Sequence, residues 1–458
     1  MIGKYLVFSI LILCLVTASV QNFGTDLSWR TTPKADKDDV TELAWMSTQS
    51  FRKYLDDNDN RVSDKFPVTS YYYPTVNFWF LIYTQFESNQ VVIHDKTNLS
   101  LIYKVLDFSS LHAKGLNKNI LYVLQQKIST DRISKLKTDL HYLAANPFSL
   151  EPEAKTIYRT LKESGIKLPI NTSDRKAFFK KLKDNVRTQT GQRNFIKEGI
   201  IRSLPYKTFL AKYFSGHKLP PELLAVPFLE SSFNPKAESR VGAMGTWQFM
   251  PLIASYYVPK KSRSPQYDYR SNVGVISAAA AFLMKENFQL MKSWDMAVTA
   301  YNSGTKHLLK TKRELASIKT NINLEAVIKH SDSQHFGFAS KNFYSEFLAL
   351  VHALAYEEEL FSDIHRDDRY NMEDDLNFYL TKCSLRFEKV LDTTQMDDVL
   401  YYNHHINQSK LPYPRGTIVT VKEKLPAGKF YKLSSKQIID HKPKDWLKLL
   451  KNQSCSTR

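Results

Sequence analysis

The fold of this chain is decided by one stretch, Pro220-Pro221-Glu222-Leu223-Leu224-Ala225-Val226-Pro227-Phe228-Leu229-Glu230-Ser231-Ser232-Phe233-Asn234-Pro235. The opening prolines favour the start of a helix, because a proline at the first helical position has no amide to lose and a preset φ. On that helix Leu223, Val226, Pro227 and Glu230 follow the i, i+3, i+4, i+7 spacing of an inward-facing stripe. The pattern therefore places one carboxyl group in an apolar row.

Glu230 is for this reason the first candidate catalytic residue. Burying a carboxylate costs free energy unless the group is paired or protonated, so we expect its pKa to be raised. A glutamic acid that stays protonated near neutral pH is able to serve as a general acid. The alternative, a glutamate at a helix end that turns back to solvent, is not excluded by the stripe alone.

Two further motifs follow in the chain. Gly242-Ala243-Met244-Gly245-Thr246-Trp247-Gln248-Phe249-Met250-Pro251 places two glycines around a short turn, and Trp294-Asp295-Met296-Ala297-Val298-Thr299-Ala300-Tyr301-Asn302-Ser303-Gly304 predicts a helix that ends at a glycine. Sugar-binding sites are commonly built from such parts: a carboxylic acid of raised pKa, flat aromatic faces, and amide side chains that bond hydroxyl and N-acetyl groups.

These motifs together resemble the catalytic domain of the soluble lytic transglycosylase family, a lysozyme-like fold related to goose-type lysozymes. The family's Glu-Ser pair matches Glu230-Ser231, and its Gly-Leu-Met/Trp-Gln motif matches Gly245-Thr246-Trp247-Gln248 with threonine in place of leucine. Its Ala-Tyr-Asn-Ala-Gly motif matches Ala300-Tyr301-Asn302-Ser303-Gly304. Asp268 to Asn272, before an alanine-rich helix expected over 277–285, looks like the D-type subgroup of membrane-bound lytic murein transglycosylases. The expected fold class is therefore mainly α.

The fourth family motif, Glu-Thr-Arg-Asn-Tyr-Val, is only partly present. Its place is taken by Ala339-Ser340-Lys341-Asn342-Phe343-Tyr344. Phe343 stands where the family has its active-site tyrosine, and Tyr344 follows it. The resemblance covers about residues 205–355, and three motifs in the family's order make it specific.

The resemblance implies a role for each matched residue. Glu230 acts as general acid and then as base, and no cofactor takes part. Substrate contacts are expected from Ser231, Gln248, Tyr301, Asn302, Phe343 and Tyr344. A second carboxylate near Glu230 is expected only from Glu238, in an exposed turn, or from Asp268, which precedes Arg270 and favours a structural pairing or capping role. A single acid suits a transglycosylase, because most glycosidases use two carboxylates.

Three other functions remain open at this point. A lysozyme-like hydrolase on the same fold is favoured by Phe343, because the family has a tyrosine at that position. A non-catalytic wall-binding protein would use the same groove without turnover. A basic exported protein would bind an anionic partner through residues 71–204.

The chain ends carry two further expectations. Residues 1–20 combine a basic start, an apolar run and small residues for cleavage, which predicts a secretory signal peptide and an exported, envelope-associated protein. After its removal Cys383 and Cys455 are the cysteines that remain, and in an oxidising compartment we expect them to pair.

The formal net charge is +18, from 64 basic and 46 acidic residues. Export argues against nucleic acid as the partner, and an anionic envelope polymer beside peptidoglycan fits better. The histidines show neither a His-Glu-x-x-His motif nor a cysteine–histidine zinc spacing, so no metal cofactor is expected.

The expected organisation has four parts after the signal peptide. They are a polar N-terminal segment (21–70), a mostly helical accessory region (71–204), the catalytic domain (205–358) and a small α+β module (370–458) that faintly resembles a LysM sugar-binding module.

Overall fold

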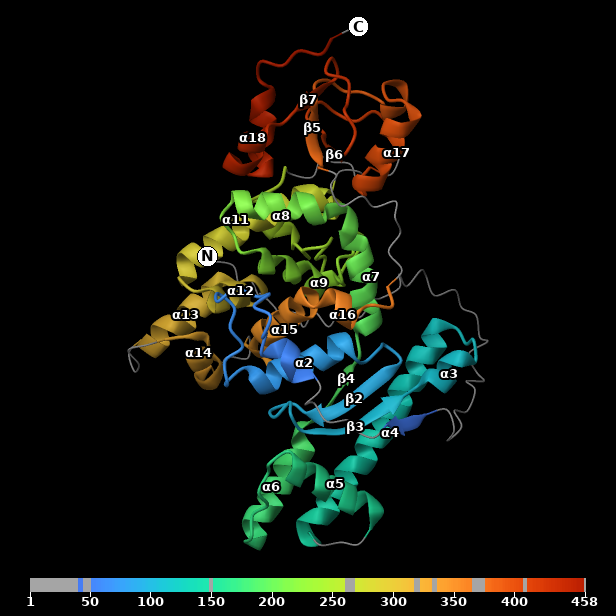
Figure 1. The fold of residues 1–458 in the computed structure, drawn as a ribbon, viewed down its shortest axis with the longest axis vertical. Coiled ribbons are helices and arrows are strands. Elements are labelled where there is room, and N and C mark those ends of the chain that lie inside the picture. The colour runs from blue at the N-terminus through green and yellow to red at the C-terminus, as the bar shows by residue number, and fades with distance from the viewer. Residues whose placement is uncertain are drawn as a thin grey trace, which may run out of the picture.

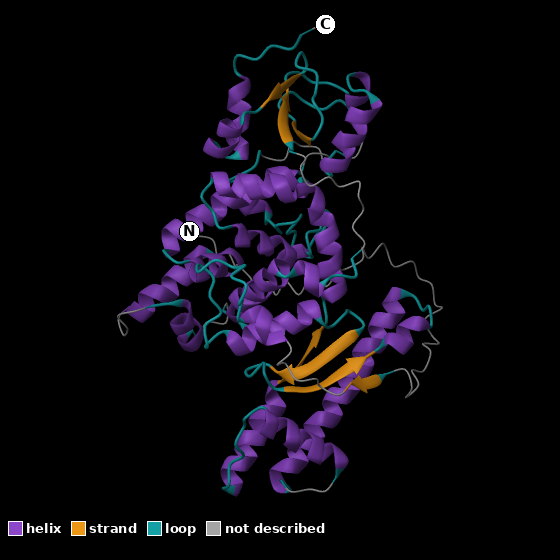
Figure 2. Cartoon of the chain, viewed as in Figure 1, coloured by secondary structure: helices purple, strands orange, loops and turns teal. Residues whose placement is uncertain are grey.

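The computed structural model describes residues 40–43, 51–147, 151–259, 268–316, 322–331, 336–364, 375–406 and 410–456. In this part of the chain helices predominate, with two small antiparallel sheets, as Figure 2 shows. The signal peptide expected at residues 1–20 lies outside the described residues. None of the helices in the described ranges is long and apolar enough to cross a membrane.

The central body of the molecule is a bundle of helices around α11 (Val273–Met291) and α15 (Phe338–Ala355) (Figure 1). The helix expected over 277–285 is confirmed as part of α11, whose alanines are buried. The helix expected to end at Gly304 is confirmed as α12 (Trp294–Ser303), since Gly304 follows it with a φ of +81°. The other helices of this body are α8 (Lys207–Gly216), α9 (Val226–Ser231), α10 (Pro251–Ala254), α13 (Thr305–Ala316), α14 (Leu324–His330) and α16 (Glu357–Leu360), with the 3-10 turns η4 (Leu204–Tyr206), η5 (Pro221–Ala225) and η7 (Tyr269–Ser271).

Two N-terminal helices belong to the same hydrophobic core. These are α1 (Arg52–Leu55) and α2 (Tyr73–Thr84), and α2 packs along α15. Phe66 is fully buried, with its ring centroid 5.2 Å from that of Phe347 on α15. The core of the central body therefore begins well before residue 205, within stretches that the sequence analysis assigned to the polar segment and the accessory region.

A sheet module follows α2 in the chain and lies below the central body in Figure 1. Its four strands have the order β1-β3-β2-β4 and pair antiparallel. The elements are β1 (Thr41–Leu43), β2 (Gln90–Asp95), β3 (Ile102–Asp107), α3 (Ser109–Ala113), α4 (Lys118–Ala145), α5 (Pro152–Glu163), α6 (Thr172–Asn185) and β4 (Val186–Thr190).

Both faces of this sheet are buried. Val92 faces the core of the central body, whereas Val91 and Ile93 face a second core formed with α4, α5 and α6. A strand buried on both sides is a continuous apolar run rather than an alternating one, which explains the pattern Val91-Val92-Ile93. The sheet is thus a middle layer, and one of its faces meets the helices that carry the site.

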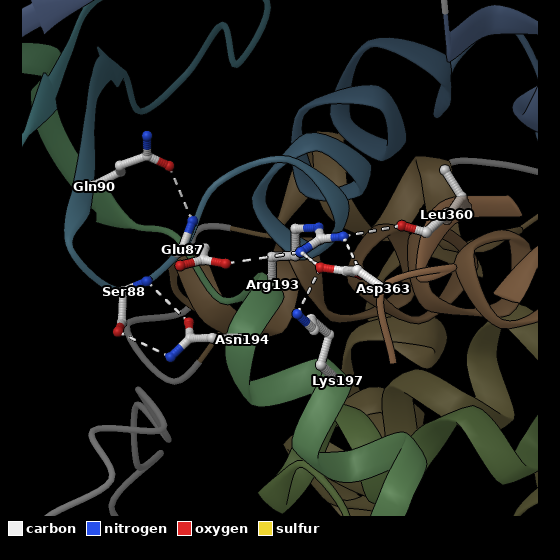
Figure 3. Close-up of polar contacts among 8 residues, drawn as sticks. All are labelled: Glu87, Ser88, Gln90, Arg193, Asn194, Lys197, Leu360 and Asp363. Carbon is white, nitrogen blue, oxygen red and sulfur yellow. Dashed lines mark hydrogen bonds and ion pairs between the residues drawn. The ribbon is translucent and has the colours of Figure 1, made fainter. Parts of the chain in front are cut away.

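Arg193, the first residue of α7 (Arg193–Ser203), attaches the sheet module to the central body, as Figure 3 shows. The Arg193 guanidinium donates to both carboxylate oxygens of Asp363, at 3.1 and 2.8 Å, and lies 3.7 Å from the Glu87 carboxylate. Lys197, one turn along α7, bonds the same Asp363 at 2.7 Å. These contacts join the turn before β2, helix α7 and the segment after α16.

Gly191 lies in the connection from β4 to α7 and allows it to pass close to the connection from α2 to β2. A Cβ atom at this position would lie 2.4 Å from the backbone of Phe86 and Glu87. Only glycine permits so close an approach of two backbones.

The C-terminal module covers the opposite end of the central body. Its three strands have the order β6-β5-β7. Asn403, after α17, accepts a hydrogen bond from Asn272 at 2.8 Å, and Cys383 is bonded to Cys455 with a Cα–Cα distance of 5.7 Å. The elements are β5 (Asn377–Thr381), η8 (Phe387–Lys389), α17 (Thr393–Tyr402), β6 (Ile418–Val421), β7 (Phe430–Lys432), α18 (Ser435–Asp440) and η9 (Pro443–Leu450).

Candidate active site

Glu230 lies at the end of a short helix that is buried in the central body. The single helix expected from the stripe is in fact the 3-10 turn η5 followed by α9. The inward stripe is retained, because Leu223, Val226 and Glu230 are all buried and the Glu230 side chain is only 4% exposed. The helix stops directly after the Glu-Ser pair, since Ser232 and Phe233 both have left-handed backbone angles (φ of 50° and 56°). Such angles cost roughly 1 kcal/mol or more each for residues with side chains and tend to occur at functional sites.

The environment of Glu230 favours its protonated form. Burial, and then the nearby charge of Glu346, raise the pKa of Glu230 to about 8. A carboxyl group with that pKa is mostly protonated at neutral pH and is therefore able to donate a proton.

Glu346 is a second carboxyl group at the site, and the sequence analysis missed it. It lies on α15 and is partly exposed, and its Oε2 accepts a hydrogen bond from the Tyr83 hydroxyl at 3.3 Å. Burial raises the pKa of Glu346 to about 8, although the Tyr83 bond and the positive charge of Arg187 oppose the shift. The criterion that selected Glu230 applies here too, since Glu346 is the single acidic residue of the mostly apolar helix 338–355.

The two carboxylates that the sequence offered as partners do not affect the pKa of Glu230. Glu238 is exposed, as expected. Asp268 caps η7 by accepting the backbone N–H of Arg270, and its carboxylate lies 2.7 Å from the Arg270 guanidinium. The structural role expected for Asp268 is therefore confirmed.

Ser231 links α9 to the loop that carries the second motif. Its hydroxyl lies 2.9 Å from the Thr246 carbonyl oxygen and accepts the Asn234 backbone N–H at 3.0 Å. Gln248 lies in the same loop, has a left-handed φ of 46°, and donates its side-chain amide to the Gly245 carbonyl at 2.9 Å. Both side chains thus hold the loop beside Glu230.

Gly245 is required by the packing of this loop. It has a φ of +80°, and a Cβ atom there would lie 1.7 Å from the Arg270 carbonyl oxygen. The loop is therefore pressed onto the segment that begins α11, and no side chain fits between them.

Tyr301 and Asn302 reach the site from α12. The Tyr301 hydroxyl donates to the Trp247 carbonyl oxygen at 2.6 Å. Burial, together with the charge of Glu230, raises the pKa of Tyr301 well above its usual value, which places its hydroxyl near the candidate acid. Asn302 accepts a hydrogen bond from the Ser340 hydroxyl at 3.1 Å, which ties α12 to the first turn of α15.

Phe343 and Tyr344 are both buried on α15 but have different surroundings. Phe343 precedes Glu346 by three residues and so lies near the same face of the helix. Tyr344 packs against the rings of Tyr72 and Phe347, at centroid distances of 5.3 and 6.0 Å. The structure thus gathers Glu230, Ser231, Gln248 and Tyr301, links Asn302 to them through α12, and turns Tyr344 into the core.

A family model matches the part of the chain that carries most of these residues. Residues 211–323 match the family model described as the transglycosylase SLT domain. This chain carries a transglycosylase SLT domain. The match contains the Glu-Ser pair, the glycine loop and α12, so the SLT domain supplies most of the site. Glu346 and Tyr83 lie outside it.

The chain is also similar to curated relatives over part of its length. It is 34% identical over 131 residues to the membrane-bound lytic murein transglycosylase D of Escherichia coli strain K12, which is 28% of this chain and 27% of that protein. It is 36% identical over 112 residues to a transglycosylase of Enterobacteria phage PRD1, which is 24% of this chain and 39% of that protein. The chain therefore spans well under half of the length of each of these relatives.

Proposed function

We propose that this chain is a peptidoglycan lytic transglycosylase that cleaves the β-1,4 bond between N-acetylmuramic acid and N-acetylglucosamine and forms 1,6-anhydromuramyl products. The observation that carries the proposal is Glu230, a buried carboxyl group whose pKa is raised to about 8. The SLT domain match and the similarity to a lytic murein transglycosylase support it.

Glu230 acts twice in the proposed reaction. As an acid it protonates the glycosidic oxygen while the bond to the muramyl carbon breaks, and the substrate's N-acetyl group stabilises the developing positive charge. As a carboxylate it then takes the proton of the sugar's 6-hydroxyl, whose oxygen closes the 1,6-anhydro ring. The proton count balances, and water is not consumed.

The neighbouring side chains position the acid and the sugar. The Asn302 carbonyl accepts from Ser340, and its amide N–H groups make no hydrogen bond among the described residues, so they are available to a sugar. Gln248 bonds the Gly245 carbonyl, and Tyr301 sets the position of the loop through the Trp247 carbonyl.

A lysozyme-like hydrolase is the second candidate, and Glu346 is the observation that favours it. Hydrolysis with inversion needs a base to activate water, and retention through an enzyme nucleophile needs a second carboxylate. Glu346 lies close enough to Glu230 for its charge to raise the pKa of Glu230, and neither Glu238 nor Asp268 has this effect.

Digestion of purified peptidoglycan in heavy-oxygen water separates the candidates. The proposed reaction gives muramyl ends that are lighter by one water and carry no label from the solvent. Label in a new reducing end, without any anhydro product, would establish the hydrolase. Binding of the wall without soluble products would instead indicate a non-catalytic wall-binding protein.

Location and partners belong to the same proposal. An enzyme acting on peptidoglycan works in the cell envelope, which agrees with the signal peptide expected at residues 1–20. The net charge of +18 favours contact with anionic envelope polymers over contact with nucleic acid in that compartment.

A further inference from the structure

Arg187 on β4 is a cation whose hydrogen-bonding groups have no partner among the described residues. Its guanidinium carbon lies 4.1 Å from the centroid of the Phe338 ring, and the side chain is partly exposed. Its Nε atom is buried and meets no acceptor, and its other nitrogens form no hydrogen bond or ion pair with the described residues. A guanidinium has five N–H donors in a planar fork, so its bonding capacity here is open.

The groups that the structure describes around Arg187 leave its charge uncompensated at neutral pH. His94 is its partner across the β2–β4 ladder, and burial lowers the pKa of His94 to about 4, so that ring is neutral. Glu346 is the acidic group that acts on Arg187, and it is mostly protonated at neutral pH because its pKa is about 8. Burial lowers the pKa of Arg187, yet an arginine remains charged at neutral pH.

The first turns of α15 connect this cation to the candidate active site. Phe338, under the guanidinium, begins α15, and Ser340 two residues later bonds Asn302. The charge of Glu346, two turns along the same helix, raises the pKa values of both Arg187 and Glu230. Strand β4 therefore brings Arg187 from the sheet module to the first turn of α15, which also contacts Asn302.

We propose that Arg187, backed by the ring of Phe338, forms a subsite for a carboxylate on the lactyl-peptide arm of a muramyl residue. The proposal rests on the proposed function, because it assumes a peptidoglycan strand bound at the candidate active site. A guanidinium fork pairs with a carboxylate through two parallel N–H···O bonds, and a ring beneath it fixes the plane of the fork. This subsite would also give the sheet module a role in substrate binding, since the module would recognise the peptide beside a site that binds sugars.

The alternative is that Arg187 only attaches the module to α15 through its contact with Phe338. The two roles differ in their dependence on ligand charge. A subsite affects the binding of substrates that carry a carboxylate, whereas an attachment role affects stability and all ligands alike.

Binding is measured with the full chain in a Glu230→Gln background, which prevents turnover, at a pH of about 6 so that Glu346 stays protonated. Three probes are used: glycan strands with peptide stems, the same strands after an amidase has removed the stems and exposed the lactyl carboxylate, and a neutral N-acetylglucosamine oligosaccharide. Arg187→Ala should weaken binding of at least one of the two charged probes about tenfold or more, which is the usual effect of losing a charged hydrogen bond. Binding of the neutral oligosaccharide should stay within twofold.

The second probe identifies which carboxylate is bound. Weakening with intact strands alone assigns the subsite to a carboxylate of the peptide stem. Weakening with the amidase-treated strands alone assigns it to the lactyl carboxylate, because the lactyl group of intact strands is an amide. Equal loss with all three probes, or no loss with any, overturns the proposal. Because the affinities do not depend on turnover, they test the subsite separately from the heavy-oxygen experiment on the reaction.

Two control variants keep the test decisive. Arg159→Ala removes an exposed arginine from α5 of the same module, 69% exposed, and should leave all three affinities unchanged. Arg187→Lys keeps the charge but loses the planar fork, so it should show an intermediate loss with the charged probes only. Should Arg187→Ala fail to fold, an Arg187→Lys protein with unchanged affinity for every probe would equally overturn the proposal.

Discussion

The carboxyl group of Glu346 on α15 lies close enough to Glu230 on α9 for its charge to raise the pKa of Glu230. The hydrogen bond from Tyr83 and the charge of Arg187 both favour ionised Glu346. Glu346 is therefore the member of the pair that loses its proton first as the pH rises, and its charge then holds the remaining proton on Glu230.

Glu230→Gln should abolish wall degradation while keeping the fold. The amide has nearly the volume of the acid but cannot transfer a proton, and the loss of a general acid typically costs on the order of a hundred- to ten-thousand-fold in rate. Release of soluble fragments from purified peptidoglycan measures the effect, and the exposed Glu238→Gln is the matched control. Activity of Glu230→Gln comparable to that of the wild type would refute the assignment.

Glu346→Gln should move the alkaline limb of the pH–rate profile to lower pH. In the wild type the reaction needs protonated Glu230, so the rate should fall as the pH passes the Glu230 pKa of about 8. Without the charge of Glu346 the pKa of Glu230 falls, so the alkaline limb of the profile moves to lower pH as well. A profile with an unchanged limb would show that Glu346 does not act on the acid, and complete loss of turnover at every pH would point to Glu346 as a hydrolytic base.

The same pKa shift predicts how stability depends on pH. The pKa of Glu230 rises from an ordinary value of 4.5 to about 8 on folding, so the folded state binds this proton more tightly than the unfolded chain does. The stability contributed by the proton is complete below pH 4.5 and is lost as the pH rises through about 8.

Glu230→Gln removes this dependence. Relative to the wild type, it should therefore have a higher Tm at a pH of about 9 and a nearly equal one at a pH of about 4. Thermal unfolding at the two values measures the difference. A variant that is less stable than the wild type at the higher pH would contradict a buried, protonated Glu230.

Local sequence patterns predicted the elements that carry the site. The stripe ending at Glu230, the helix ending at Gly304 and the alanine-rich α11 are all set by short-range periodicity and glycine. The motif order predicted the SLT domain, which family comparison matches over residues 211–323.

The rest depends on contacts between distant segments. Phe66 and α2 join the core of the central body only because they pack on α15. Glu346 becomes a site residue because α15 packs against α9 and α2, and Tyr83 reaches it from α2. The sequence marks Glu346 as a lone acidic residue on an apolar helix, but its place near Glu230 depends on packing between distant segments. The carboxylates expected from the sequence were therefore Glu238 and Asp268, which are nearer to Glu230 along the chain.

The disulfide should contribute measurably to stability. Cys383 and Cys455 are separated by 72 residues, and closing a loop of that length restricts the unfolded chain, an effect typically worth about 2–4 kcal/mol. A Cys383→Ser, Cys455→Ser double variant should therefore unfold at a lower temperature. Thiol counting in the native, unreduced protein should find neither cysteine free, and two free thiols would contradict the pairing.

Gly245→Ala should be strongly destabilising, and Gly165→Ala is its matched control. Both glycines have a left-handed φ, +80° and +70°, so alanine costs roughly 1 kcal/mol at either position. The surroundings differ, because a Cβ atom at Gly165 meets nothing within 4 Å, whereas at Gly245 it would lie 1.7 Å from the Arg270 carbonyl oxygen.

The clash at Gly245 forces two backbone segments apart, at an additional cost of about 3 kcal/mol. Because Thr246 in the displaced loop holds the Ser231 hydroxyl, activity should fall together with Tm. Thermal unfolding and wall degradation measured for both variants isolate the effect of close packing from that of backbone conformation. Equal Tm values for the two variants would show that the loop does not press on the start of α11.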